Sequence, residues 1–375
     1  MKYIVNFLRV IVGVFFIFSG FVKAIDPVGF SYKLEEYFSP QIFNIGFLHD
    51  MALPQATFLS IFEILLGVLL LLGIFRKFTV WALLLMILFF SFLTFYSAYF
   101  NKVTDCGCFG DFMKLEPWTS FWKDIILLVL ILVILLGIKH IKPFTRNRSL
   151  NITALAVAVL ICGWISYMGI KKQPIIDFRA YAVGKNIPEG MKSAEELGKE
   201  PPQFRVTYTM KNKETGEITK ITDQEYLEDD KWYREGTPWE LQVDLTETKK
   251  ISSGYEPPIH DFILDCEEGD MTDVYMEEPK LVFFVMPFAD KVSTESVNQL
   301  NQLYNELITK DVKVIGLSNG DVAGTDFQIC FVDQITLKTM LRTNPGIMTL
   351  KTGTVVGKFH NNPLPTTEEI LETMN

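Results

Sequence analysis

The chain has 375 residues, enough for two or three domains, and 49% of them are hydrophobic. Its net charge of −9 is unevenly spread, because residues 1–170 hold 13 Lys and Arg against 9 Asp and Glu, whereas residues 171–375 hold 22 against 35. An apolar, slightly basic half therefore precedes an acidic, more polar half. Because phosphate binding needs a basic face, this balance argues against nucleic acid as a partner.

The first half contains five apolar stretches, and a helix needs about 20 such residues to cross a bilayer. The stretches lie at about residues 3–24, 56–75, 78–100, 122–139 and 152–170. We expect the first to be a retained span and not a signal peptide, because its apolar run is long and no small-residue cleavage motif follows it.

Lys and Arg residues in the short loops predict the orientation of these spans. Arg76 and Lys77 follow the second span, and the loop 139–148 after the fourth carries four more Lys and Arg residues. If both loops are cytoplasmic, the amino terminus is cytoplasmic and everything after the fifth span lies outside. We therefore expect a multi-pass protein of the bacterial inner membrane with a periplasmic carboxyl-terminal region.

Three ionisable residues fall in or at the ends of the first two spans. We expect Arg9 and Lys23 to snorkel to the interfaces. Glu63 lies about eight residues into the second span, where an unpaired carboxylate would be costly. It should be protonated or paired with Lys23 or Arg9. Glu63 is a candidate both for binding a cofactor such as a quinone and for a purely structural role, and the sequence favours neither.

The loop between the third and fourth spans reads VTDCGCFGDF (103–112) and carries Cys106 and Cys108 on the side where thiols can stay oxidised. A disulfide between them would close a small, strained ring, which would make it easily reduced. The pair therefore suits exchange with a substrate dithiol, and both cysteines are candidate catalytic residues. A structural clamp remains an alternative. A soft-metal site is disfavoured because the loop adds only Asp105 and Asp111 as ligands, so no metal site is predicted.

The second half reads as two further segments. Residues 203–222 alternate apolar and polar about Gly216, which predicts a hairpin, and 240–246 is a possible third strand, so 173–255 is expected to be small and β-rich. From residue 256 onward, the expected elements are, in order, a strand within PPIHDFILDCEEGD, a buried strand at 279–287, a helix at 293–309, a strand at 312–318, a helix within DQITLKTMLRT and two strands about a KTG turn.

The other three cysteines are assigned structural positions. Cys162 falls in the fifth span, where we expect it to be inert packing. Cys266 and Cys330 lie at or within expected strands. A disulfide between them is considered, but two separate cysteines are the favoured interpretation.

Several short motifs of the first half together resemble the DoxX/MauE family of four-helix membrane proteins. These are Ser19, Gly20 and Lys23 in the first span, Glu63 and Gly67 in the second, and DCGCFG in the following outer loop. The resemblance covers about residues 1–140. It implies a role beside thiol or quinone redox chemistry, and MauE itself is linked to maturation of a disulfide-rich periplasmic enzyme.

Residues 256–375 resemble membrane-tethered periplasmic thioredoxins in the order of their elements. The resemblance is specific at PPIHDF before the first strand and at NPGIMTL, where Pro345 matches the family's cis-proline. The position of the family's Cys-x-x-Cys reads MPFADKVSTES, which has no cysteine. The domain should therefore not work as a thioredoxin by itself.

The expected fold is multi-domain, with a helical membrane bundle, a β-rich segment and an α/β thioredoxin-like domain. The expected boundaries are a four-helix membrane domain at 1–140, a cytoplasmic loop and tethering fifth span at 141–172, the β-rich segment at 173–255 and the thioredoxin-like domain at 256–375. The leading hypothesis is an inner-membrane accessory protein for thiol–disulfide chemistry, in one version linked to a quinone, that acts on an extracytoplasmic protein. The alternative is a non-enzymatic assembly or peptide-binding protein that uses the degenerate thioredoxin fold as a scaffold. Membrane lipid is the other expected partner.

Overall fold

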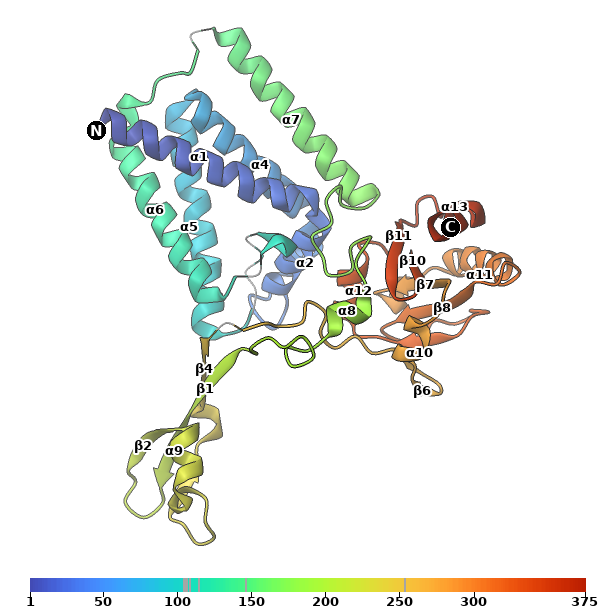
Figure 1. Ribbon diagram of the computed structural model, residues 1–375. Helices are drawn as coiled ribbons and strands as arrows, with labels where there is room; N and C mark the ends of the chain where they lie inside the picture. Colours follow the sequence, from blue (N-terminus) through green and yellow to red (C-terminus); the bar gives the residue numbers. More distant parts are fainter. Residues whose placement is uncertain (104–106, 108, 114, 146, 253) are drawn as a thin grey trace. The chain divides into compact units, whose positions relative to one another are not determined.

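The computed structural model describes residues 1–103, 107, 109–113, 115–145, 147–252 and 254–375. Within these residues, five helices are long and apolar enough to span a membrane (Figure 1). They are α1 (Lys2–Ile25), α4 (Ala52–Leu72), α5 (Arg76–Phe100), α6 (Pro117–Leu136) and α7 (Arg148–Lys171). The five predicted spans are thus confirmed as helices.

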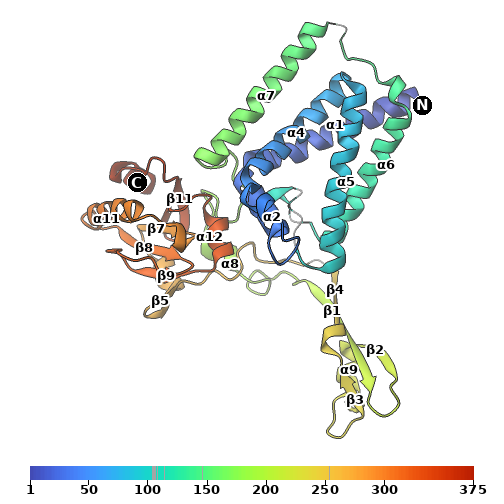
Figure 2. The ribbon, with the colours of Figure 1, turned by 180° about the vertical axis from the view of Figure 1, so that it is seen from behind.

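Small residues bring the first two long helices into close contact. α1 packs along α4, and α5 packs along α6 (Figure 2). A Cβ atom added at Gly67 would lie 2.6 Å from the carbonyl oxygen of Gly13, and one added at Gly20 would lie 2.9 Å from that of Ser60. Close backbone approach at small residues is typical of helix packing in membranes, where lipid removes the hydrophobic drive between helices.

Two short helices that the sequence did not predict lie between α1 and α4. They are α2 (Pro27–Phe38) and α3 (Gly46–Asp50). The carboxylate of Asp26 accepts a hydrogen bond from the backbone N–H of Gly29 at 2.8 Å, and Pro27 occupies the first helical position, so α2 has a well-formed amino-terminal cap. Single-turn 3-10 helices follow later, η1 (Gly110–Phe112) and η2 (Ile138–His140).

The carboxyl-terminal region is built on a seven-stranded sheet with the order β11-β10-β7-β8-β9-β5-β6. β7 is parallel to β8 and β8 to β9, whereas β10 is antiparallel to both β7 and β11. The strand predicted at the start of this region is reduced to the two-residue β5. The strands are β5 (Asp265–Cys266), β6 (Gly269–Asp270), β7 (Leu281–Met286), β8 (Lys313–Ser318), β9 (Ile329–Phe331), β10 (Gly346–Lys351) and β11 (Thr354–Phe359).

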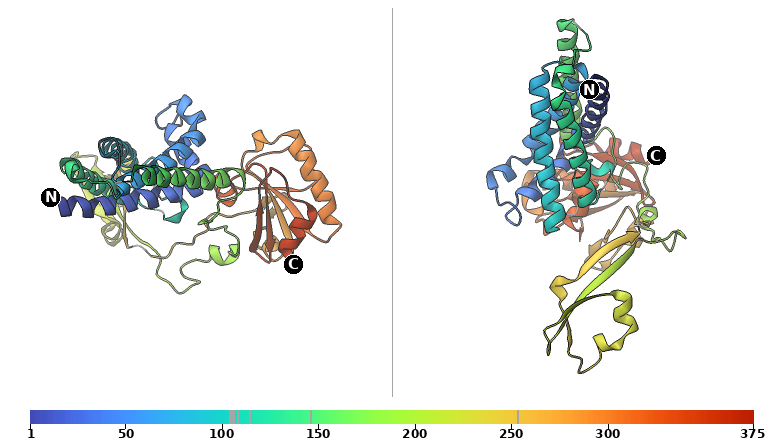
Figure 3. Two further views of the ribbon diagram at one scale, coloured as in Figure 1. Left: turned by 90° about the horizontal axis from the view of Figure 1, so that it is seen from above. Right: turned by 90° about the vertical axis from the view of Figure 1, so that its left-hand side faces the viewer.

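Helices cover the sheet and bury the strand β7 completely. α11 (Thr294–Ile308) runs along the sheet (Figure 3) and shares one hydrophobic core with α13 (Thr367–Met374). Val282 and Phe284 of β7 meet Leu300 of α11 in that core, each with no exposed surface. α12 (Gln334–Met340) also packs against β7 and β8, and the remaining short helices are α10 (Thr272–Met276) and η5 (Ala289–Lys291).

Cys266 and Cys330 form a disulfide, so the favoured interpretation of two separate cysteines was wrong. β5 and β9 are antiparallel neighbours in which Asp265 pairs with Phe331. This register brings the two adjoining cysteines together across 64 residues of sequence. Cys162 is buried in α7 and carries a free thiol.

Residues 187–260 form a compact unit of their own, separate from the unit of residues 1–186 and 261–375. β1 (Gln203–Asn212) pairs in antiparallel fashion with β2 (Ile218–Thr222), β3 (Trp239–Leu241) and β4 (Glu247–Ser252). The predicted hairpin about Gly216 is therefore confirmed. The third strand is shorter than expected, and β4 was not predicted. The unit also contains α8 (Ile187–Met191), α9 (Asp223–Glu228), η3 (Asp230–Trp232) and η4 (Val243–Leu245).

Candidate functional site

A buried ion pair joins α1 to α4 inside the bundle. The ammonium group of Lys23 lies 2.7 Å from a carboxylate oxygen of Glu63, and these residues are 2% and 3% exposed. Lys23 also donates a hydrogen bond to the hydroxyl of Ser19 at 2.8 Å. The predicted pairing of Glu63 is confirmed. The predicted snorkelling of Lys23 is wrong, because its charge is satisfied inside the bundle.

Arg9 is also buried, and its predicted snorkelling to the interface stays a prediction. Its guanidinium donates hydrogen bonds to the carbonyl oxygens of Leu71 at 2.6 Å and Lys142 at 2.8 Å. The last carbonyls of a helix have no partner within the helix and carry partial negative charge. Arg9 therefore stabilises the end of α4 and ties it to the loop that precedes α7.

A second buried pair, which the sequence analysis missed, lies on α6. The ammonium group of Lys123 is 2.7 Å from Asp124, and the other oxygen of that carboxylate accepts a hydrogen bond from Thr94 of α5 at 3.0 Å. Asp124 is 1% exposed. The signal in the sequence was two adjacent ionisable residues at the start of a predicted span.

The space between the two buried pairs is too small for a quinone. A cavity of about 10 Å³ is lined by Lys23, Glu63, Lys123, Asp124 and six neighbours, which are Phe15, Phe16, Ser19, Ile87, Phe90 and Leu127. A volume of roughly 10–15 Å³ holds about one water molecule. The residues around Glu63 therefore form a packed polar core and do not fit a quinone ring.

The described residues of the 103–112 loop are held against the bundle. Phe109 packs edge-on against Phe15 of α1 with ring centroids 5.7 Å apart, and the ammonium group of Lys123 lies 5.2 Å from the Phe109 centroid. Gly107 has a φ of +66°, a conformation that favours glycine. Cys106 and Cys108 themselves lie outside the described residues.

Arg342 of the α/β region is ion-paired with two carboxylates of the amino-terminal region. Its guanidinium lies 2.8 Å from Asp26 and 2.5 Å from Asp111, which follows Cys108 by three positions. Burial disfavours the charged form of Arg342, but the two carboxylates outweigh it and raise the pKa of the guanidinium. Burial likewise opposes ionisation of Asp26, yet Arg342 and Arg179 hold its pKa below the usual value.

The segment around Pro345 contacts the loop that follows β7. The Asn344–Pro345 peptide bond is cis, as predicted from the sequence. The Asn344 side chain accepts a hydrogen bond from the backbone N–H of Phe288 at 3.3 Å and donates one to its carbonyl at 3.0 Å. Phe288 lies in the stretch MPFADKVSTES, where the resemblance to thioredoxins places the family's Cys-x-x-Cys.

A third charged cluster joins the segment after α7 to β11. Asp177 lies 2.6 Å from Arg179 and 2.7 Å from Lys358. Burial opposes its ionisation, but hydrogen bonding and charge from Arg179, followed by Lys358, lower the pKa of Asp177 to about 2. Burial and the Arg179 charge lower the pKa of Lys358 to about 7, so Arg179 is the more persistent partner of Asp177 near neutral pH.

The apolar helices, their close packing and their internal ion pairs support a multi-pass membrane protein with a β-rich carboxyl-terminal region. Residues 1–137 match the family model described as methylamine utilisation protein MauE. The matched range includes α1 to α6, both buried pairs and the loop that carries Cys106 and Cys108. No match was found among curated proteins or among solved structures.

Proposed function

We propose that this chain is a membrane-anchored accessory protein for thiol–disulfide chemistry in the maturation of extracytoplasmic proteins. Cys106 and Cys108 are the exchanging pair. The MauE match over residues 1–137 supports an accessory role in the membrane. The redox role is supported by the two closely spaced cysteines in a loop that we place on the oxidising side.

The observation that carries the proposal is the Arg342 ion pair with Asp111. Asp111 stands three positions after Cys108, and Arg342 stands three positions before Pro345. The 2.5 Å contact therefore links the cysteine-bearing loop to the segment that contains the cis-proline. A protein bound at the α/β region would be presented to the cysteine pair.

The α/β region is proposed to be a thioredoxin-like binding domain without exchange chemistry of its own. In favour of this, β7, α11 and β8 form a parallel unit, followed by α12, the cis-proline and the antiparallel pair β10 and β11. The turn after β7, residues 287–291, has no cysteine. The Asn344 side chain bonds both the backbone N–H and the carbonyl of Phe288, so this turn and the cis-proline segment lie side by side, as the proposed thioredoxin-like fold requires.

The exchange proceeds through a mixed disulfide. A substrate thiolate attacks Cys106 of the Cys106–Cys108 disulfide, forms a mixed disulfide and releases the Cys108 thiolate. A second substrate thiolate then attacks the substrate sulfur of the mixed disulfide and releases the Cys106 thiolate. The substrate loses two electrons and the pair gains two. Each step is reversible, so a lone Cys106 thiolate can also attack a substrate disulfide.

A cysteine trap tests the proposal. In Cys108→Ser, Cys106 can attack but the product cannot be resolved, so a covalent partner should appear on a non-reducing gel and vanish with reductant. Cys162→Ser is the matched control, because it removes a buried thiol elsewhere in the chain and should trap nothing. A Cys106→Ser/Cys108→Ser variant should also trap nothing. If Cys108→Ser gives no adduct while its thiols remain accessible to alkylation, the exchange proposal fails.

The orientation belongs to the proposal and has its own test. Reporter fusions after Asn147 should report the cytoplasm, and fusions after Gly110 or Asn375 should report the outside. The alternative function, a non-enzymatic scaffold, is favoured by the Cys266–Cys330 disulfide, which uses both cysteines of the α/β region for structure. Unchanged partner binding and stability in the Cys106→Ser/Cys108→Ser variant would support the scaffold instead.

A further inference from the structure

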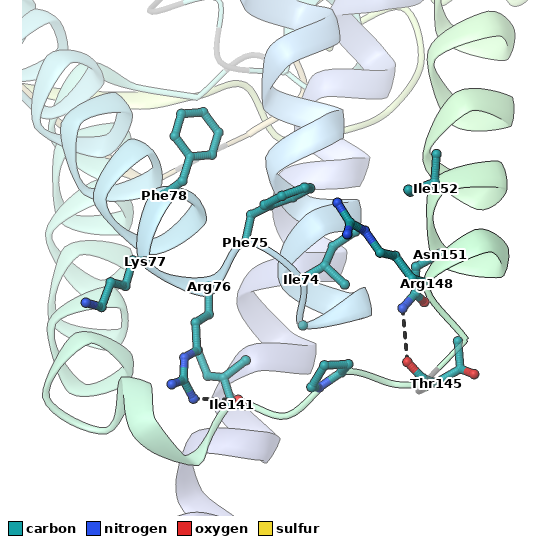
Figure 4. Close-up of a pocket in the computed structure, with 12 residues that line it drawn as sticks. Ile74, Phe75, Arg76, Lys77, Phe78, Ile141, Thr145, Arg148, Asn151 and Ile152 are labelled. Atoms are coloured by element: carbon teal, nitrogen blue, oxygen red, sulfur yellow. Dashed lines mark hydrogen bonds between the residues drawn. The ribbon is translucent and has the colours of Figure 1, made fainter.

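A large pocket lies at the end of the bundle opposite to the 103–112 loop. Its volume is about 780 Å³, and it is bounded by the turn between α4 and α5, by residues 141–145 and by the start of α7. Figure 4 shows Ile74, Phe75 and Phe78 on one side and Arg148, Asn151 and Ile152 on the other. Volumes of roughly 300–1,000 Å³ are typical of small-ligand sites.

The pocket combines cations with exposed apolar surface. Arg76, Lys77 and Arg148 line it. Phe75 and Phe78 also line it and are 61% and 57% exposed. Such a mixture suits a ligand with an anionic head and a hydrocarbon body.

Among the residues that the structure describes, no acidic side chain lines the pocket. The sequence has no Asp or Glu at positions 64–104 or 125–176. Among the described residues, the polar contacts of Arg76 are to backbone carbonyls, those of Lys139 at 3.3 Å and Ile141 at 3.4 Å. The pocket therefore carries a net positive charge that an anion would complement.

The side chains place Arg148 at the centre of the pocket. In Figure 4, Arg148 extends from α7 toward Phe75, whereas Lys77 points away from it. Asn151 is 5% exposed and donates a hydrogen bond to the carbonyl of Thr145 at 3.0 Å. Its buried Oδ1 has no hydrogen-bond partner among the described residues, so a hydroxyl group of a ligand would satisfy it.

We propose that this pocket binds an anionic phospholipid of the surrounding leaflet, with glycerol as the head alcohol. Arg148 and Arg76 contact the phosphate. The glycerol hydroxyls lie toward Asn151, and the first acyl carbons pack on Phe75, Phe78 and Ile152. Basic pockets between membrane helices bind anionic headgroups by this combination of charge and apolar contact.

Native mass spectrometry of the full-length protein in a neutral detergent tests the proposal. The protein is given equal amounts of phosphatidylglycerol and phosphatidylcholine with identical acyl chains. The wild type should retain phosphatidylglycerol in preference, and Arg148→Gln should weaken that preference by about fivefold, as expected for loss of one cation near the headgroup. Arg148→Lys should keep most of it.

The matched control is Lys171→Gln/Lys172→Gln, which removes two charges at the other end of α7 and should leave the preference unchanged. Ile152→Trp should weaken retention of both lipids by filling the apolar side, which keeps the proposal testable if Arg148→Gln misfolds. Equal retention of the two lipids by the wild type would overturn the proposal. So would an equal effect of the Lys171/Lys172 variant, or displacement of the lipid by an equimolar amount of inorganic phosphate.

Discussion

Removing one partner of the Lys23–Glu63 pair should destabilise the folded protein, whereas replacing both partners together should not. Removing one partner of a buried ion pair costs about 3–5 kcal/mol, because the other charge is left uncompensated. Lys23 would keep the Ser19 hydroxyl at 2.8 Å and the Phe90 ring at 5.0 Å, so Glu63→Leu should fall at the lower end of this range. Glu63 has no other hydrogen-bond or ion-pair partner among the described residues, so Lys23→Met should fall at the upper end.

The double variant Lys23→Met/Glu63→Leu should recover most of the loss. Replacing a buried pair by apolar residues of similar volume is often neutral or stabilising. We therefore expect the double variant to unfold within about 1 kcal/mol of the wild type. Because each single variant should lose at least about 3 kcal/mol, this implies a coupling energy of at least about 5 kcal/mol in magnitude.

Unfolding of the full-length protein in mixed micelles, titrated with SDS and followed by circular dichroism, measures these four free energies. Phe7→Leu is the matched control, because Phe7 lies on α1 and is 66% exposed, and its change should stay within about 0.5 kcal/mol. A double variant that loses as much as the sum of the two single variants would refute the reasoning.

Two further predictions concern the α/β region. Cys266→Ser/Cys330→Ser should lower the free energy of unfolding by about 4 kcal/mol for a loop of 64 residues, measured by thermal melting; an unchanged melting temperature would contradict it. The pKa of Asp177 is about 2 in the folded state against 3.8 ordinarily. Ionised Asp177 should therefore add about 2 kcal/mol to the free energy of unfolding above pH 4, and this contribution should be lost as the pH falls toward 2. The protection of residues 173–182 against hydrogen exchange, relative to the intrinsic rate at each pH, should then fall over that pH range in the wild type but not in Asp177→Asn.

The long apolar helices could be predicted because a bilayer imposes length and composition on each span separately. The element order of the carboxyl-terminal region was also visible, since β7, α11 and β8 have clear local patterns. The contacts that assemble the candidate site were not local. Arg342 and Asp26 are separated by 316 positions, and no local sequence pattern at either residue indicates that the two would pair.

Contacts between residues separated by tens of positions were predicted only in part. Glu63 was expected to find a cation because burial demands one, although the sequence could not choose between Lys23 and Arg9. The disulfide between Cys266 and Cys330 was not favoured from the sequence, where 64 residues separate them. The pairing of the two-residue β5 with β9, which brings them together, has no local signal. Short elements such as α2 and β5 are stabilised by tertiary contacts, so their own residues predict them poorly.

The ion pairs of Arg342 have a consequence for how the protein can be regulated. Both carboxylates and the guanidinium belong to one chain, so their association is intramolecular and is driven by an effective concentration that can reach the millimolar range. A contact of modest intrinsic strength can therefore be closed most of the time and still open quickly. A carboxylate from another molecule could displace Asp111 from Arg342 only by competing against this effective concentration.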